Sequence, residues 1–112
     1  MIVQITGVLK NKNIDEIIIE ANGLGYLCHI SNNTFNRLPS VGENITIPTF
    51  LHIMENKHTL YGFSDIEERK LFKMLISVSG IGPKIGIQLL SNANSDQFST
   101  MIINSDVKML SS

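Results

Sequence analysis

A glycine turn between two apolar segments carries the clearest chemical signal in this 112-residue sequence. In the stretch VSGIGPKIGIQLL, Gly80 and Gly82 flank Ile81, Pro83 follows, and Lys84 comes next. Glycines leave backbone N–H groups uncovered, and proline favours the first position of a helix. A helix that begins at Pro83 presents unpaired N–H groups and the positive end of its dipole, with the Lys84 ammonium close by. This arrangement suits an anion, and a DNA backbone phosphate fits it well.

The alternative is that the same turn only joins two helices. Gly80 is then a helix C-cap, Gly82 a turn residue and Lys84 a solvated side chain. The amphipathic segment before the turn, the apolar residue between the glycines and the lysine after them together favour the phosphate site. A dinucleotide-binding fingerprint is disfavoured, because the third glycine, Gly86, comes one residue too late and a helix rather than a strand precedes the turn.

Other residues that do chemistry in proteins are not arranged for it here. His29, His52 and His58 lack a metal-ligand spacing, and Cys28 has no second thiol partner. No nucleophile elbow, catalytic triad motif or ATPase phosphate-binding loop is present. We therefore expect no metal, no cofactor and no catalytic residues.

The bulk composition limits the class of protein. A net charge of −1 argues against charge-driven, nonspecific nucleic-acid binding by the whole chain, although a local basic site is compatible with it. The single cysteine excludes a disulfide within the chain and is typical of a reduced, buried thiol. No apolar run approaches the roughly 18 residues of a membrane span, and no secretion signal opens the chain. We expect a cytoplasmic protein that does not bind a membrane.

Before residue 64 the pattern is that of short strands. Runs rich in β-branched residues alternate with turn signals, among them Asn-Gly in NGLGY. Five strands in so short a segment favour closure into a small barrel, because closure removes exposed edges. We predict an oligonucleotide-binding (OB-fold) barrel over residues 1–63. Its strands are expected at the opening MIVQITGVLKN and at 14–21, 26–31, 44–55 and 58–63, with a short helical turn in TFNRLPSVGE.

After residue 63 the apolar spacing becomes helical. Ser64 is the expected N-cap of the first helix, with Glu67 completing a capping box, and this helix is predicted to run to about Ser79. A second helix is predicted from Pro83. SNANSDQFSTMIINSD predicts a third, shorter helix after a cap at Ser95 or Asn94, and DVKMLSS predicts the opening of a fourth. Residues 64–112 are thus expected to form an incomplete helical domain.

In the order of its features the chain resembles the RuvA family of Holliday-junction-binding subunits. The resemblance covers the whole chain and rests on MIVQITGVL, NGLGYLCHI, TFNRLP, LYGFSDIEERKLFKMLISVSGIGPKIGIQLL and DQFSTMI. It implies an OB-fold barrel, a domain with two helix-hairpin-helix motifs, a linker and a small C-terminal domain. Four such subunits lie on an open four-way DNA junction as the non-catalytic part of a branch-migration helicase complex in recombination and DNA repair. The implied partners are the hexameric ATPase RuvB and the resolvase RuvC.

The resemblance assigns roles to residues of this chain. The first helix-hairpin-helix corresponds to Ser79, Gly80, Ile81, Gly82 and Lys84, which are implied to hold DNA phosphates. This assignment agrees with the chemistry expected of the glycine turn.

The family also carries an acidic pin of two neighbouring acids, which repels phosphates at the centre of the tetramer. Glu55 matches the first acid, but Asn56 stands where the second is expected and Lys57 follows. We therefore expect weaker repulsion from this pin. The alternative for Glu55 is an ordinary charged hairpin tip.

The chain departs from the family in length, because it ends at Ser112, about where the second hairpin would begin. We expect a truncated product or fragment, and a natural short form is the alternative. Recruitment of RuvB should then fail, and DNA affinity should depend on a tetramer, because a single hairpin binds weakly. A rival from another class is an oligomerisation or interaction module without useful DNA binding.

Overall fold

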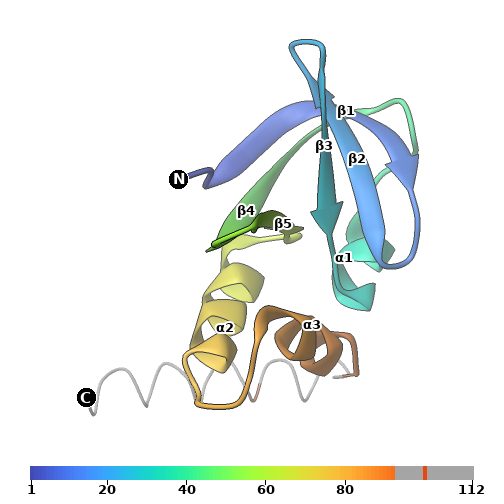
Figure 1. Ribbon diagram of the computed structural model, residues 1–112. Coiled ribbons are helices and arrows are strands. Elements are labelled where there is room, and N and C mark those ends of the chain that lie inside the picture. Colours follow the sequence, from blue (N-terminus) through green and yellow to red (C-terminus); the bar gives the residue numbers. More distant parts are fainter. Residues whose placement is uncertain (93–99, 101–112) are drawn as a thin grey trace.

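The computed structural model describes residues 1–92 and Thr100 (Figure 1). The predicted third and fourth helices lie outside the described residues, except for Thr100. The five predicted strands and the first two predicted helices are all present, with some boundaries shifted by a few residues. The elements are β1 (Gln4–Lys12), β2 (Glu16–Ala21), β3 (Leu24–His29), α1 (Asn32–Arg37), β4 (Asn44–Met54), β5 (Lys57–Gly62), α2 (Ile66–Ile76) and α3 (Pro83–Asn92).

The strands form a closed barrel in the order β1-β2-β3-β5-β4. Every neighbouring pair is antiparallel except β3 and β5, which pair in parallel at Cys28–Leu60 and His29–Tyr61. The helices α2 and α3 lie below the barrel in Figure 1, with α1 at its lower end. This confirms the predicted five-stranded barrel followed by helices, and it is consistent with an OB fold.

The Asn-Gly signal forms the tight turn that it predicts. Asn22 and Gly23 have φ angles of 53° and 84°, and the flanking Ala21 and Leu24 pair across the turn. Positive φ at both central residues is typical of a type I′ turn, which matches the twist of the two strands. The register of β2 against β3 follows from this turn.

Two apolar clusters hold the molecule together. The barrel cluster includes Leu9, Ile17, Ile19 and Cys28, all fully or almost fully buried. Burial raises the pKa of the Cys28 thiol from 9.0 to about 12, because it disfavours the thiolate. The other cluster joins the barrel to the helices and comprises Tyr61, Phe63, Leu71, Phe72 and Leu90.

The start of α2 differs from the sequence prediction by one residue. Asp65, not Ser64, is the N-cap, and its carboxylate accepts a hydrogen bond from the Glu68 N–H at 2.8 Å. Glu68 in turn accepts from the Ser64 N–H at 3.0 Å, so Glu67 does not complete a capping box. The start of α2 is shifted by one residue because Glu68 is the acid that is buried. The burial of Glu68 is set by residues far away in the sequence.

The end of α2 was also predicted too late, at Ser79. The helix ends at Ile76 with Ser77 as its C-cap. The Ser77 N–H bonds to the carbonyl of Met74, and the Ser77 hydroxyl donates to the same carbonyl at 2.6 Å. These bonds to the residue three positions earlier tighten the last turn and end the helix before Gly80 is reached.

Candidate nucleic-acid interface

The residues between α2 and α3, hereafter the α2–α3 turn (77–82), form a compact connection. Gly80 has a φ of 88°, in the left-handed region that favours glycine. The Ile81 N–H bonds back to the Val78 carbonyl at 3.1 Å, and the Gly82 carbonyl accepts the first helical bond of α3, from Gly86, at 2.9 Å. The turn is therefore fixed by its own backbone bonds.

The start of α3 leaves backbone donors available. The N–H groups of Lys84 and Ile85 come before the first backbone hydrogen bond of α3. Like other N–H groups at the start of a helix, they lack an intrahelical partner. A Cβ atom built on Gly80 or on Gly82 would meet no atom within 4 Å. Open space thus surrounds these glycines, and the exposed Lys84 lies beside the same helix end. An anion has room to approach the backbone here.

The remaining predicted residues of the turn lie as follows. Ser79 is exposed, and Ile81 is half-buried. The fully buried α3 residue of the cluster that joins the helices to the barrel is Leu90. The role of Ser79, Gly80, Ile81, Gly82 and Lys84 as phosphate ligands stays a prediction.

Gly86 allows α2 and α3 to approach closely, a role that was not predicted from the sequence. A Cβ atom at Gly86 would lie 3.2 Å from a side-chain carbon of Ile76 and 3.2 Å from a ring carbon of Phe72. The bare backbone at Gly86 therefore allows close contact of α2 and α3. A glycine inside a helical pattern is the available signal, because it has a cost that packing must offset.

A buried carboxylate connects the barrel side of the molecule to α2. Glu68 is fully buried and accepts hydrogen bonds from the hydroxyls of Ser31 (2.7 Å) and Thr34 and from the Ser64 N–H. Ser31 is the N-cap of α1, so the network ties the starts of two helices together. No local pattern marked Glu68 among the acids of its helix turn.

Lys84 also borders a groove between the barrel and α3, hereafter the barrel–helix groove. Its volume is about 360 Å³. The barrel side contributes Lys57, Thr59 and Tyr61 from β5 and His29 from β3, and α3 contributes Lys84, Ile87 and Gln88; Asp15 and Ile30 complete the lining. The groove brings together residues that are distant in sequence, so no local pattern predicts it.

Comparison with known proteins decides the family. The family model described as the RuvA N terminal domain matches residues 1–62, more than half of the chain. The chain belongs to the RuvA family. Proteins named Holliday junction branch migration complex subunit RuvA are similar over the whole chain or nearly so. The one from Neisseria meningitidis (serogroup C, strain FAM18) is 46% identical over 112 residues, all of this chain, and the one from Geotalea daltonii is 42% identical over 110 residues, 98% of it.

The match covers only part of these RuvA relatives. The chain spans 58% of the Neisseria protein and 55% of the Geotalea protein. It confirms the resemblance found in the sequence. The activity and partners of the full-length RuvA proteins are therefore proposals for this chain.

The turn in which the acidic pin was predicted lies between β4 and β5. Glu55 and Asn56 are its two central residues, both exposed, and Met54 pairs with Lys57 across it. The turn thus presents one carboxylate and one amide to solvent, with the lysine at the start of β5. Its role as a pin stays a prediction.

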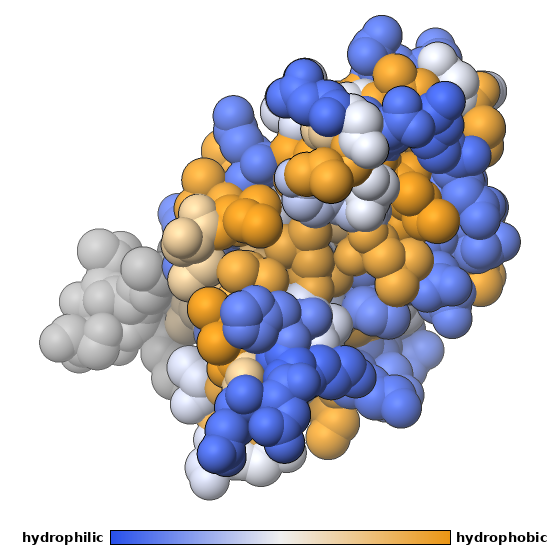
Figure 2. Space-filling model, turned by 45° about the horizontal axis from the view of Figure 1, so that its top comes forward, coloured by the Kyte–Doolittle hydropathy of each residue, from blue (hydrophilic) through white to orange (hydrophobic). Residues whose placement is uncertain are grey.

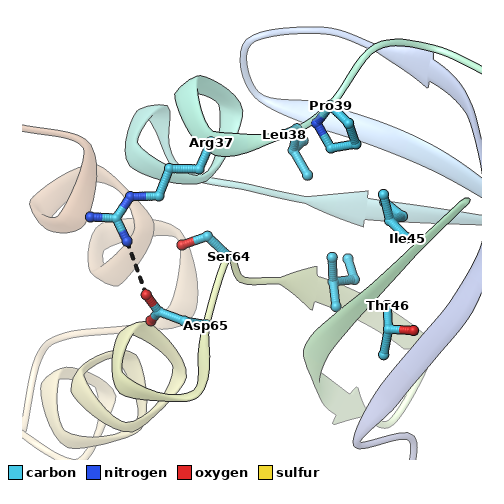
Figure 3. Close-up of a pocket in the computed structure, with 8 residues that line it drawn as sticks. Arg37, Leu38, Pro39, Ile45, Thr46, Ser64 and Asp65 are labelled. Atoms are coloured by element: carbon cyan, nitrogen blue, oxygen red, sulfur yellow. Dashed lines mark hydrogen bonds and ion pairs between the residues drawn. The ribbon is translucent and has the colours of Figure 1, made fainter. Parts of the chain in front are cut away.

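A second hollow of about 300 Å³ lies between α1, β4 and the start of α2 (Figure 3). Arg37 reaches across from α1 to Asp65, with 2.9 Å between guanidinium nitrogen and carboxylate oxygen. Asp65 is also the N-cap of α2, so both charged groups of this hollow are already engaged. We assign the hollow a structural role in joining α1 to α2.

Within residues 1–92 and Thr100, no three His, Cys, Asp or Glu side chains cluster so as to hold a metal ion. Nor is any helix among these residues long and apolar enough to cross a membrane.

Proposed function

We propose that this chain binds four-way (Holliday) junction DNA as a non-catalytic subunit, with the α2–α3 turn as its phosphate-binding element. The observation that carries this proposal is the open backbone of that turn. Gly80 and Gly82 have free space around them, the N–H groups at the start of α3 lack helical partners, and Lys84 is exposed beside them. Membership of the RuvA family supports junction DNA as the ligand.

The energetics require several copies of the chain on one junction. A hydrogen bond to a charged partner contributes roughly 1–3 kcal/mol, so one turn alone binds weakly. We propose a homotetramer on the junction, in which several turns act together. Partnership with the RuvB ATPase and the RuvC resolvase is proposed for the full-length form, because this chain spans 55–58% of its relatives.

Further assignments belong to the same proposal. We propose residues 1–63 as the barrel domain and 64–112 as the helical domain that binds phosphates. Glu55 acts as the single acid of a weakened pin, with Asn56 in place of a second acid. The cytoplasm is the proposed compartment, and the buried, free thiol of Cys28 agrees with a reducing environment.

The test is a gel-shift titration against a synthetic four-way junction and a duplex of equal length at several salt concentrations. The variants are Gly82→Val, which fills the open space at the turn, and Lys84→Ala, which removes the charge. Each is expected to weaken junction binding about 5- to 50-fold while the fold stays intact by circular dichroism, because each removes contact with a phosphate. Lys70→Ala is the matched control, since it removes the same charge from an exposed position of α2.

Two outcomes contradict the proposed DNA binding. One is binding by Gly82→Val and Lys84→Ala that equals binding by Lys70→Ala. The other is absence of junction binding by the folded parent chain. ATP turnover by the purified chain would contradict the non-catalytic role.

The second candidate function is an assembly module without DNA binding. The observation in its favour is the number of large hydrophobic side chains exposed on strands, among them Leu24, Leu27, Ile53 and Met54. Figure 2 shows hydrophobic residues gathered across the middle of one face, between hydrophilic groups. Self-association measured by sedimentation, together with no junction binding, is the result expected for this function.

A further inference from the structure

The barrel–helix groove has two opposed walls whose side chains are arranged by simple geometry. Lys57, Thr59 and Tyr61 alternate along β5, and alternate residues of a strand point to the same side. Lys84 and Gln88 are four residues apart on α3 and therefore share one helix face. The two lysines thus stand on different walls of one groove, one from the barrel and one from the helix.

The charge in this groove is available to a ligand. Lys57 and Lys84 are both exposed, and the ion pairs found among residues 1–92 involve neither of them. The lining contains one carboxylate, that of the exposed Asp15, so the two lysines outnumber it. The centroids of the His29 and Tyr61 rings lie 5.7 Å apart, and both residues line the groove. A site of about 360 Å³ falls in the size range of small-ligand clefts.

We infer that Lys57 and Lys84 bind phosphates of the same DNA strand from opposite walls of the barrel–helix groove. The inference rests on the proposed junction binding and extends it, because it makes the barrel itself part of the phosphate-binding surface. The ligand class is the sugar-phosphate backbone, since lysine ammonium groups attract its charge without reading bases. The strand path then runs from the α2–α3 turn along the groove toward the β4–β5 turn.

This assignment separates two neighbouring roles in the β4–β5 turn. Glu55 is exposed at the centre of the turn, whereas Lys57 starts β5 and lines the groove. The basic residue next to the pin position therefore attracts the DNA backbone in the groove, while the acid acts at the tip.

The experiment measures junction affinity against salt concentration for the purified 112-residue chain and three variants. Lys57→Ala is expected to weaken binding about 3- to 10-fold and to lower the slope of log affinity against log salt by about 1, as the loss of one phosphate contact requires. Asp15→Asn is expected to strengthen binding about 2-fold, because it removes the opposing charge from the groove. The control is Lys10→Ala, which removes a lysine from β1 outside the groove.

The outcomes are distinct for the inference and for the function on which it rests. If the parent chain binds junctions and Lys57→Ala matches Lys10→Ala in both affinity and slope, the inference is wrong and the proposed function stands. If the folded parent chain binds no junction at any salt concentration, both are wrong. Unfolding curves identify any variant that loses its fold. If Lys57→Ala is unfolded, Asp15→Asn tests the inference, because it is expected to strengthen junction binding, and unchanged or weaker binding contradicts the inference.

Discussion

The buried carboxylate of Glu68 is the residue on which the junction between barrel and helices depends most. A buried charge is costly unless hydrogen bonds compensate it, and here hydroxyls and a backbone N–H from three other residues do so. The donors Ser31 and Thr34 come from the start of α1, and Ser64 precedes α2. The network therefore sets where α2 begins and how it leaves the barrel.

Glu68→Ala is expected to lower the free energy of unfolding by about 3 kcal/mol, because it leaves a cavity and removes the acceptor of the buried Ser31 and Thr34 hydroxyls. Glu68→Gln keeps the volume and one acceptor and should cost about 1–2 kcal/mol. Urea denaturation measures both. Glu67→Ala, one position earlier and exposed, is the control, with an expected change below about 0.5 kcal/mol. Equal losses for Glu67→Ala and Glu68→Ala would show that the network does not carry this stability.

At the scale of elements, the crossing of α2 and α3 depends on Gly86. Alanine there gains up to about 1 kcal/mol of helix propensity, but its Cβ lies 3.2 Å from Ile76 and Phe72. Phe72 is fully buried against Phe50, Tyr61 and Phe63, with ring centroids 5.1–5.5 Å apart, so it has little room to move. Overpacking of this kind costs about 1–3 kcal/mol.

Gly86→Ala is therefore expected to lower stability by about 1 kcal/mol in thermal or urea unfolding, and Gly86→Val by more. Gly82→Ala is the matched control, because its methyl group enters open space. A gain in stability for Gly86→Ala would contradict the expectation and would mean that the two helices separate easily.

The sequence predicts the elements of this fold better than their contacts. Alternating β-branched residues and the Asn22–Gly23 turn suffice to predict the strands, because these signals are local. The parallel pairing of Cys28 with Leu60 closes the barrel and leaves no mark in either segment. Both Ser64 and Asp65 are good helix caps, and the choice between them is made by the distant partners of Glu68.

The same limit applies to the candidate site. The α2–α3 turn was predictable because its glycines, proline and lysine are contiguous in the sequence. The barrel–helix groove was not, since Lys57 and Lys84 border it only because the fold brings β5 and α3 to opposite sides of it. In the sequence, Gly86 stands out only as the third glycine of a dinucleotide-binding fingerprint that does not fit. Its role in the structure is to allow close contact of α2 and α3.

At the scale of the whole molecule, the direction of the α2–α3 turn relative to the barrel matters for a multivalent complex. The far end of α3 is tied to α1, where the Asn33 side chain donates to the Leu90 carbonyl at 2.6 Å and the Asn32 N–H donates to the Ser91 hydroxyl at 3.1 Å. In the first half of α2, Arg69 donates to the Val3 carbonyl at 2.8 Å. These bonds add to the Glu68 network and to the apolar cluster that joins the helices to the barrel.

Several turns bind one junction together only if each copy holds its turn in the required direction, because avidity is lost when geometry forbids simultaneous contact. Asn33→Ala removes a tie and leaves the Leu90 carbonyl, near the end of α3, without its side-chain donor. We expect junction affinity to fall at least 5-fold while the weak binding of duplex by single turns changes less than 2-fold. Gel-shift titrations with the junction and with the duplex measure both affinities. The free energy of unfolding of Asn33→Ala is expected to fall by about 1 kcal/mol. Asn36→Ala, exposed on the same helix, is the control. An equal loss of junction and duplex binding by Asn33→Ala would instead mean that the tie acts on each turn separately, and the barrel would then have no part in aligning them.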